Sequence, residues 1–97
     1  MLGWFDAREA KAFGAALASD FIRQVAPKQH LPQKKFAQKA EAALAKIGRD
    51  VAEFRKSHRL NVYTRAQLTN QFKWAMKDAG YDDDYVDKLT DWLILKL

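Results

Sequence analysis

The sequence contains no cysteine, only two prolines and four glycines, and no long apolar run. The lack of cysteine excludes disulfide frameworks, thiolate zinc sites and cysteine nucleophiles, and it permits a reducing compartment. No apolar stretch approaches the roughly 18 residues that a membrane span needs. The start of the chain reaches Asp6 and Glu9 without the basic and apolar regions of a secretion signal. We therefore expect a cytoplasmic protein with no membrane association.

The residues that are present favour helix. A chain of 97 residues has room for one domain, spanning 1–97, and 48% hydrophobic against 30% charged residues is a globular balance. Alanine, leucine, lysine and glutamine are common, and apolar residues recur at spacings of three and four. The sequence predicts an all-α fold, a small four-helix bundle-like domain with one long central helix.

The first helix is expected to start at Asp6, whose carboxylate can cap the first turn, and to end before Pro27. Ala10, Gly14 and Ala18 lie along the edge of its apolar face, so another backbone could approach closely there. That face comprises Ala10, Phe13, Leu17, Phe21 and Val25.

The second helix is expected from about Pro32 to about Arg59, long enough to serve as the spine of the bundle. Gly48 lies inside it and marks a bend or a tight contact. Its apolar face comprises Phe36, Ala40, Ala43, Ile47, Val51, Phe54 and His58.

The third helix has the clearest start and stop signals. Thr64 and Gln67 fit a capping box, Tyr63 and Leu68 fit a hydrophobic staple, and Gly80 can adopt the left-handed conformation that ends a helix. Its inward face is expected to comprise Leu68, Phe72, Ala75, Met76 and Ala79.

The fourth helix is expected to start at residues 82–84, where three aspartates favour the positive end of the helix dipole. Ile94 and Leu95 point away from its apolar face, so the last turn either wedges between helices, which we favour, or meets another molecule. That face comprises Val86, Leu89, Leu93 and Leu97, widened by Tyr85 and Trp92.

Positive charge is concentrated in the middle of the chain. The net charge is +5, and residues 27–62 carry nine basic and three acidic residues. A basic stripe on the second helix could follow a phosphate backbone, although a solvated helix face is the more common explanation. The stripe comprises Lys34, Lys35, Lys39, Lys46, Arg49, Lys56 and Arg59.

Trp74 lies opposite the apolar face of the third helix, beside Asn70, Lys73 and Lys77. A large aromatic among polar and cationic neighbours suits a protein-binding hot spot or a base-stacking platform. The alternative is that the segment Trp4–Phe5 or another helix covers Trp74 and makes it part of the core.

Asp83, Asp87 and Asp91 recur every four residues on the fourth helix and form an acidic ladder. Such a ladder favours docking against a basic surface, within one chain or between two copies. The spacing lacks the glycine and oxygen ligands of a calcium loop, so no metal is expected. The same acidity argues against a DNA-binding helix-turn-helix formed by the last two helices.

No signature of catalysis is visible. The serines lack a nucleophile motif, there is no glycine-rich phosphate loop, and the histidines, His30 and His58, have no evident catalytic partner. We therefore expect a non-enzymatic protein without cofactors, which binds another protein or a second copy of itself. The alternative is weak, sequence-independent nucleic-acid binding through the basic stripe.

Two regions carry a resemblance. They are residues 4–9, Trp-Phe-Asp-Ala-Arg-Glu, and residues 59–81, which include Asn61-Val62-Tyr63, Phe72-Lys73-Trp74 and Ala79-Gly80-Tyr81. In these stretches the chain resembles small, uncharacterised all-helical bacterial proteins. The resemblance implies the helical fold and no activity.

Overall fold

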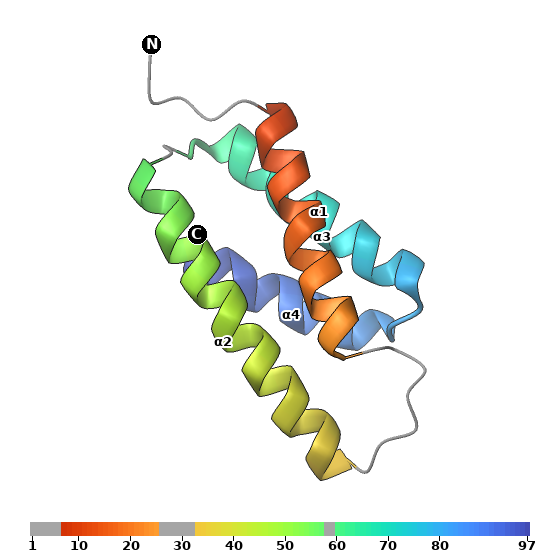
Figure 1. Ribbon diagram of the computed structural model, residues 1–97. Helices are drawn as coiled ribbons and strands as arrows, with labels where there is room; N and C mark the ends of the chain where they lie inside the picture. Colours follow the sequence, from red (N-terminus) through yellow and green to blue (C-terminus); the bar gives the residue numbers. More distant parts are fainter. Residues whose placement is uncertain (1–6, 26–32, 58–59) are drawn as a thin grey trace.

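The computed structural model describes residues 7–25, 33–57 and 60–97, and these form four α-helices without any strand (Figure 1). The predicted all-α fold is therefore confirmed, and the longest helix is the second. The expected cap Asp6, the prolines Pro27 and Pro32, and both histidines lie outside the described residues. The helices are α1 (Ala7–Gln24), α2 (Gln33–Ser57), α3 (Val62–Ala79) and α4 (Asp83–Lys96).

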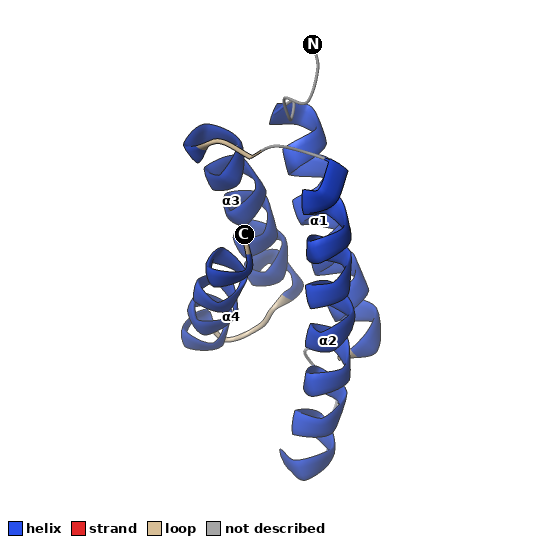
Figure 2. Cartoon of the chain, turned by 90° about the vertical axis from the view of Figure 1, so that its left-hand side faces the viewer, coloured by secondary structure: helices blue, strands red, loops and turns tan. Residues whose placement is uncertain are grey.

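The helices form two layers, with α1 and α2 in one and α3 and α4 in the other (Figure 2). The closest packing is between α1 and α3, and among the helix pairs that pack together α2 and α4 contact each other least. The N-terminal end of α2 extends past the other helices (Figure 1). Within the described ranges, none of the four helices combines the length and the apolarity that crossing a membrane requires.

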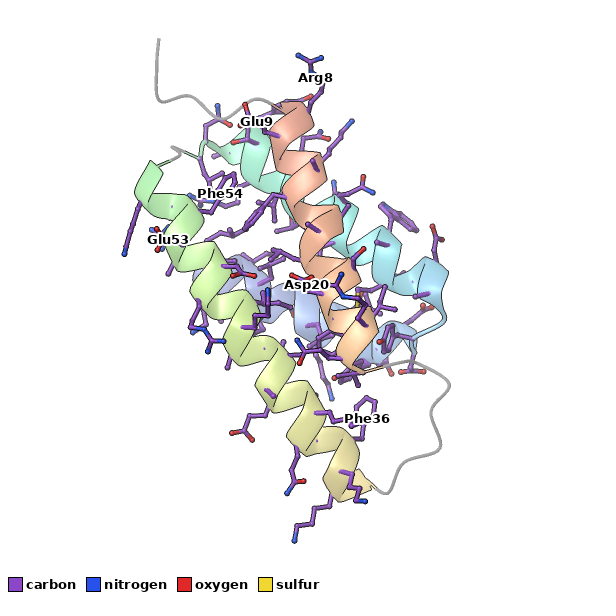
Figure 3. All side chains as sticks on the ribbon, viewed as in Figure 1. Arg8, Glu9, Asp20, Phe36, Glu53 and Phe54 are labelled. Atoms are coloured by element: carbon purple, nitrogen blue, oxygen red, sulfur yellow. The ribbon has the colours of Figure 1, made fainter. Side chains whose placement is uncertain are left out.

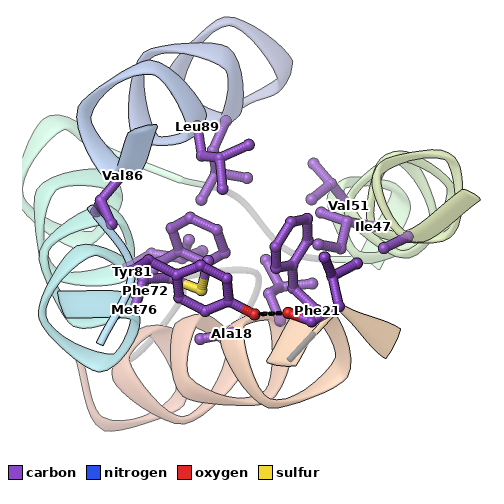
Figure 4. Packing of buried hydrophobic residues seen from close by; sticks show 14 of the residues in the cluster. Ala18, Phe21, Ile47, Val51, Phe72, Met76, Tyr81, Val86 and Leu89 are labelled. Carbon is purple, nitrogen blue, oxygen red and sulfur yellow. Dashed lines mark hydrogen bonds between the residues drawn. The ribbon is translucent and has the colours of Figure 1, made fainter. Parts of the chain in front are cut away.

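The core consists of the apolar face of each helix, as the spacing predicts (Figure 4). Phe21 from α1 and Phe72 from α3 are fully buried at its centre, and α2 and α4 close it with Ile47 and Leu93. Burying each side chain of this size contributes about 1.5–3 kcal/mol. The buried apolar residues are Ala10, Leu17, Ala18, Phe21, Val25, Ala40, Ala43, Ile47, Val51, Leu68, Phe72, Met76, Tyr81, Val86, Leu89, Leu93 and Leu97.

Gly14 explains the close packing of α1 on α3. A Cβ atom at Gly14 would overlap the carbonyl oxygen of Leu68 and lie 3.3 Å from the Cβ of Gln71. Only a residue without a side chain fits against that backbone. The predicted close approach at this edge of α1 is therefore confirmed.

The start of α3 lies earlier than predicted. Asn61 is the N-cap: its side-chain oxygen accepts a hydrogen bond from the Thr64 backbone N–H at 2.8 Å, and the Thr64 hydroxyl accepts one from the Asn61 N–H at 3.0 Å. The placement of the cap at Thr64 was wrong because asparagine caps as well as threonine and comes first. Tyr63 is 62% exposed, so the expected staple is also wrong, whereas Gly80 ends the helix at φ 104° as predicted.

Tyr81 connects the end of α1 to the turn between α3 and α4. Its hydroxyl donates a hydrogen bond to the carbonyl oxygen of Val25, which follows the last residue of α1 (Figure 4). Burial raises the pKa of Tyr81 to about 12, because the ionised phenolate would lose its hydration. The sequence analysis did not identify this contact, which joins residues 56 positions apart.

Candidate functional site

Trp74 is exposed on α3. Its side chain is 59% accessible, and the Nζ atom of Lys77 lies 5.7 Å from the centre of the ring. The alternative that Trp74 belongs to the core is therefore wrong, and the Trp4–Phe5 segment lies outside the described residues. Asn70 is also exposed and Lys73 is half-buried. The exposed ring is compatible with partner binding, which no contact in the structure tests.

A shallow polar cleft of about 410 Å³ lies between α3 and α4. It brings Asn70 and Lys73 together with Asp87 and Asp91, whereas Asp83 is not part of its lining. The remaining lining residues are Thr69, Thr90 and Ile94. Four of the seven predicted partner-binding residues therefore share one surface.

The acidic ladder is largely unpaired with the rest of the chain. Its one ion pair among the described residues joins Lys77 Nζ to an Asp87 oxygen across 3.9 Å, which is the outer limit for such a pair. Asp83, Asp87 and Asp91 are exposed. No cluster of metal-binding side chains occurs in the part of the chain that the structure describes.

The basic stripe on α2 is interrupted. Lys46 is partly exposed but its charge is paired, because its Nζ donates to Asp20 on α1 at 3.1 Å and to Asp50 at 2.8 Å. The hydrogen bonds that Lys46 donates to Asp50, the larger effect, and to Asp20 raise the pKa of Lys46. Lys46 therefore stays on the side of α2 away from the core, but two carboxylates of the same chain offset its charge and interrupt the stripe.

The remaining stripe residues divide between the two ends of α2. Lys34, Lys35, Lys39 and Arg49 are exposed, and Arg59 lies outside the described residues. Lys56 lies 3.6 Å from the Glu53 carboxylate, so part of its charge is neutralised locally. The positive surface is consequently concentrated near the start of α2.

The end of α4 does not wedge between helices as expected. Leu95 is 85% exposed and Ile94 is 46% exposed, whereas Leu97 is buried. The reason is geometric: the apolar face of α4 ends on Leu93 and Leu97, and Ile94 and Leu95 between them point away from it.

An apolar groove with a volume of about 1140 Å³ lies between α2 and α4. We call it the α2–α4 groove. Figure 3 shows Phe36 near the start of α2, on the side of the helix that faces the rest of the protein. The groove is lined by Phe36, Ala37, Ala40, Glu41, Leu44, Ala45, Gly48, Arg49, Ala52, Arg55, Tyr85, Trp92 and Lys96.

The two walls of the groove differ in chemistry. Half of the residues in the α2 wall are alanine or glycine, with the larger apolar side chains of Phe36 and Leu44 partly buried beside them. The rest of this wall is charged and consists of Glu41, Arg49 and Arg55. The α4 wall presents aromatic rings: Tyr85 lies 5.7 Å from Phe36 between ring centres, and Lys96 Nζ lies 5.6 Å from the centre of Trp92. Burial raises the pKa of Tyr85, which keeps the phenol neutral in this wall.

Gly48 lies open in the groove. A Cβ atom added there would meet no atom within 4 Å, so the expected tight contact does not occur among the residues that the structure describes. The helix also runs through Gly48 without interruption. The sequence analysis assigned α2 a single apolar face and missed this second one. The sequence feature that could have indicated this second face is a line of small residues beside the core face, formed by Ala37, Ala45, Gly48 and Ala52.

Comparisons with protein-family models, with curated proteins and with solved structures find no match for this chain.

Proposed function

We propose that this chain is a non-enzymatic, cytoplasmic protein-interaction domain that binds a helix in the α2–α4 groove. The observation that carries the proposal is an apolar groove, walled by aromatic and small side chains, that the chain leaves open at Gly48. Open apolar grooves of this size on small domains are typical docking sites.

The shape of the groove suits a helix. Its lining extends along α2 from Phe36 to Arg55, which is about 28 Å at the helical rise, or about five turns. An amphipathic helix laid there would bury its apolar face against Leu44 and Trp92 and keep its polar face in water. The small side chains at Ala45 and Ala52 allow its backbone to approach α2 closely.

The surface around Trp74 is the weaker docking candidate. Binding hot spots are aromatic anchors that sit in well-packed, water-free pockets. Trp74 stands on an outward-facing side of α3 and is partly covered by Lys77, whereas Trp92 already forms a wall of a groove. We therefore place the main contact at the groove and keep the Trp74 surface as a secondary one.

Nucleic-acid binding remains the alternative proposal. Lys34, Lys35 and Lys39 are exposed cations that could contact phosphates. Because Lys46 and Lys56 are held by acids of the same chain, the stripe offers fewer free charges than its sequence indicates. A titration with short single- and double-stranded oligonucleotides tests it: binding that weakens steeply with salt and on Lys39→Glu would support it.

Site-specific photo-crosslinking in living cells tests the groove. A photoreactive amino acid replaces Ala45, which lines the groove, or Ala42, an exposed alanine of the same helix outside it. We expect a discrete protein adduct from position 45 that disappears with Gly48→Leu, and none from position 42.

Three results would contradict the proposal. Equal adducts from positions 45 and 42 would indicate non-specific contact. An adduct only from a probe at position 74 would move the docking site to the other side of the molecule. No adduct from position 45 would remove the groove as a binding site. Circular dichroism must show that Gly48→Leu keeps the wild-type helicity, which is expected because the added side chain enters open space.

A further inference from the structure

One line of α2 residues faces the groove at regular spacing. Glu41, Ala45, Gly48, Ala52 and Arg55 recur at intervals of four, three, four and three, which is the seven-residue period by which two helices pack side by side. The middle of this line is small and its two ends carry opposite charges. A second helix can therefore come closest at Gly48.

The charges are placed symmetrically. Glu41 and Arg55 each lie seven residues from Gly48, in opposite directions along α2, or about 10 Å at the helical rise. In a dimer with a twofold axis, a residue of one copy meets its counterpart reciprocally. A twofold axis at Gly48 and antiparallel α2 helices would place Glu41 of each copy opposite Arg55 of the other. A parallel pair would instead oppose like charges.

We infer that the occupant of the α2–α4 groove is a second copy of this chain, bound with its α2 antiparallel and crossing at Gly48, so that two Glu41–Arg55 ion pairs flank the crossing. This inference rests on the proposed function of the groove. Among the residues that line the groove, Glu41 is the only acidic one, and within the described residues it forms no ion pair in its own chain. The second copy supplies the cation it lacks.

The other cationic residues of the groove are compatible with this arrangement. Arg49 lies one position after Gly48, about 100° around the helix, so it flanks the second α2 and does not face it. The Arg55 guanidinium donates a hydrogen bond to the Lys96 carbonyl oxygen at 3.2 Å, which holds it at the groove from the α4 side. A separate acidic helix would meet Arg55 together with Arg49 and Lys96, but it would leave Glu41 without a cation, and the test below distinguishes it from a second copy.

Charge reversal and its repair test the inference. Sedimentation equilibrium of the purified full chain, from micromolar to about 1 mM, is measured for wild type, Glu41→Arg, Arg55→Glu and the double variant. We expect a dimer whose Kd rises about tenfold in each single variant, because two ion pairs become two repulsions, and returns toward the wild-type value in the double variant. Lys39→Glu, an exposed change outside the groove, is the matched charge control and should leave the Kd unchanged.

The outcomes separate this inference from the function on which it rests. A monomer at every concentration would overturn the second copy as occupant, while an adduct to a different protein from position 45 would leave the docking function standing. If neither charge reversal changed the dimer Kd, or if the double variant did not restore the wild-type Kd, self-association would occur through another surface. A dimer strengthened by Glu41→Arg would show that an acidic surface occupies the groove. Loss of the position-45 adduct would remove the function itself.

Discussion

Two identical glycine-to-alanine substitutions should change the stability of this protein in opposite directions. In a helix interior, alanine is about 1 kcal/mol more favourable than glycine, because the unfolded chain has less freedom to lose. At Gly48 the new methyl group meets no atom within 4 Å. Gly48→Ala should therefore gain about 1 kcal/mol, which raises the Tm of a domain of this size by about 4–8 °C.

Gly14→Ala meets a different environment. The added methyl group would overlap the Leu68 carbonyl oxygen, a backbone atom that cannot rotate away, and the Gln71 Cβ at 3.3 Å prevents escape to that side. Forcing α1 and α3 apart is overpacking, which costs about 1–3 kcal/mol. Because the overlap is with backbone, the cost should lie near the upper end and exceed the propensity gain, leaving a net loss of about 1–2 kcal/mol.

The assay is denaturant unfolding followed by helical circular dichroism, at a concentration low enough to keep the chain monomeric. Wild type and both variants should share one slope against denaturant, so the shift in midpoint reports the difference in stability. A destabilising Gly48→Ala would show that atoms of the chain fill the groove at this position. A stabilising Gly14→Ala would show that α1 and α3 are not in close backbone contact.

Three further substitutions test the contacts that hold the helices in place. Asn61→Ala removes the cap of α3 and should lower the free energy of unfolding by about 1 kcal/mol in the same assay. If Tyr63→Ala lowered it instead, the contact that stabilises the start of α3 would be the hydrophobic staple. Tyr81→Phe should cost about 0.5–1.5 kcal/mol at neutral pH, since the Val25 carbonyl loses its donor. This cost should shrink as the pH rises from 10 toward 12, because Tyr81 then ionises in the unfolded chain before it does so in the folded one, which lowers the stability of the wild type. A cost that does not change with pH would refute the raised pKa of Tyr81. Lys46→Met should destabilise the protein less at high salt than at low salt, and an effect that is insensitive to salt would argue against the ion pairs with Asp20 and Asp50.

The sequence predicted most of the core because apolar periodicity records which residues can be buried. The stripes through Phe21, Ile47, Phe72 and Leu93 agree with the buried residues of all four helices. The close approach at Gly14 was also predictable, since small residues at spacings of four allow backbones to meet. Periodicity therefore identified the core face of each helix, whereas the local rules misplaced the start of α3, where Asn61 and not Thr64 is the cap.

The predictions failed where the deciding partner is distant in sequence. The helical wheel placed Lys46 outside the core stripe, where it is partly exposed, but it did not indicate the pairing with Asp20, 26 residues earlier. The Tyr81 contact with Val25 spans 56 residues. Neither pairing is visible until the packing of α1 against the other helices is known.

The groove shows the limit of reasoning from periodicity most clearly. A helical wheel identifies which faces of α2 are apolar or small, but only the packing decides which of these faces the chain itself covers. Here α1 and α4 cover the face around Ile47, while the neighbouring face around Gly48 stays open, because α2 and α4 contact each other least of all neighbouring pairs. A glycine in the middle of a helix lowers stability by about 1 kcal/mol relative to alanine, and at Gly48 no close contact with the described residues compensates for that loss. A second helix crossing at Gly48 could approach the α2 backbone closely because glycine has no side chain, as α3 approaches α1 at Gly14. The proposed dimer therefore explains both glycines by the same close packing of two helices.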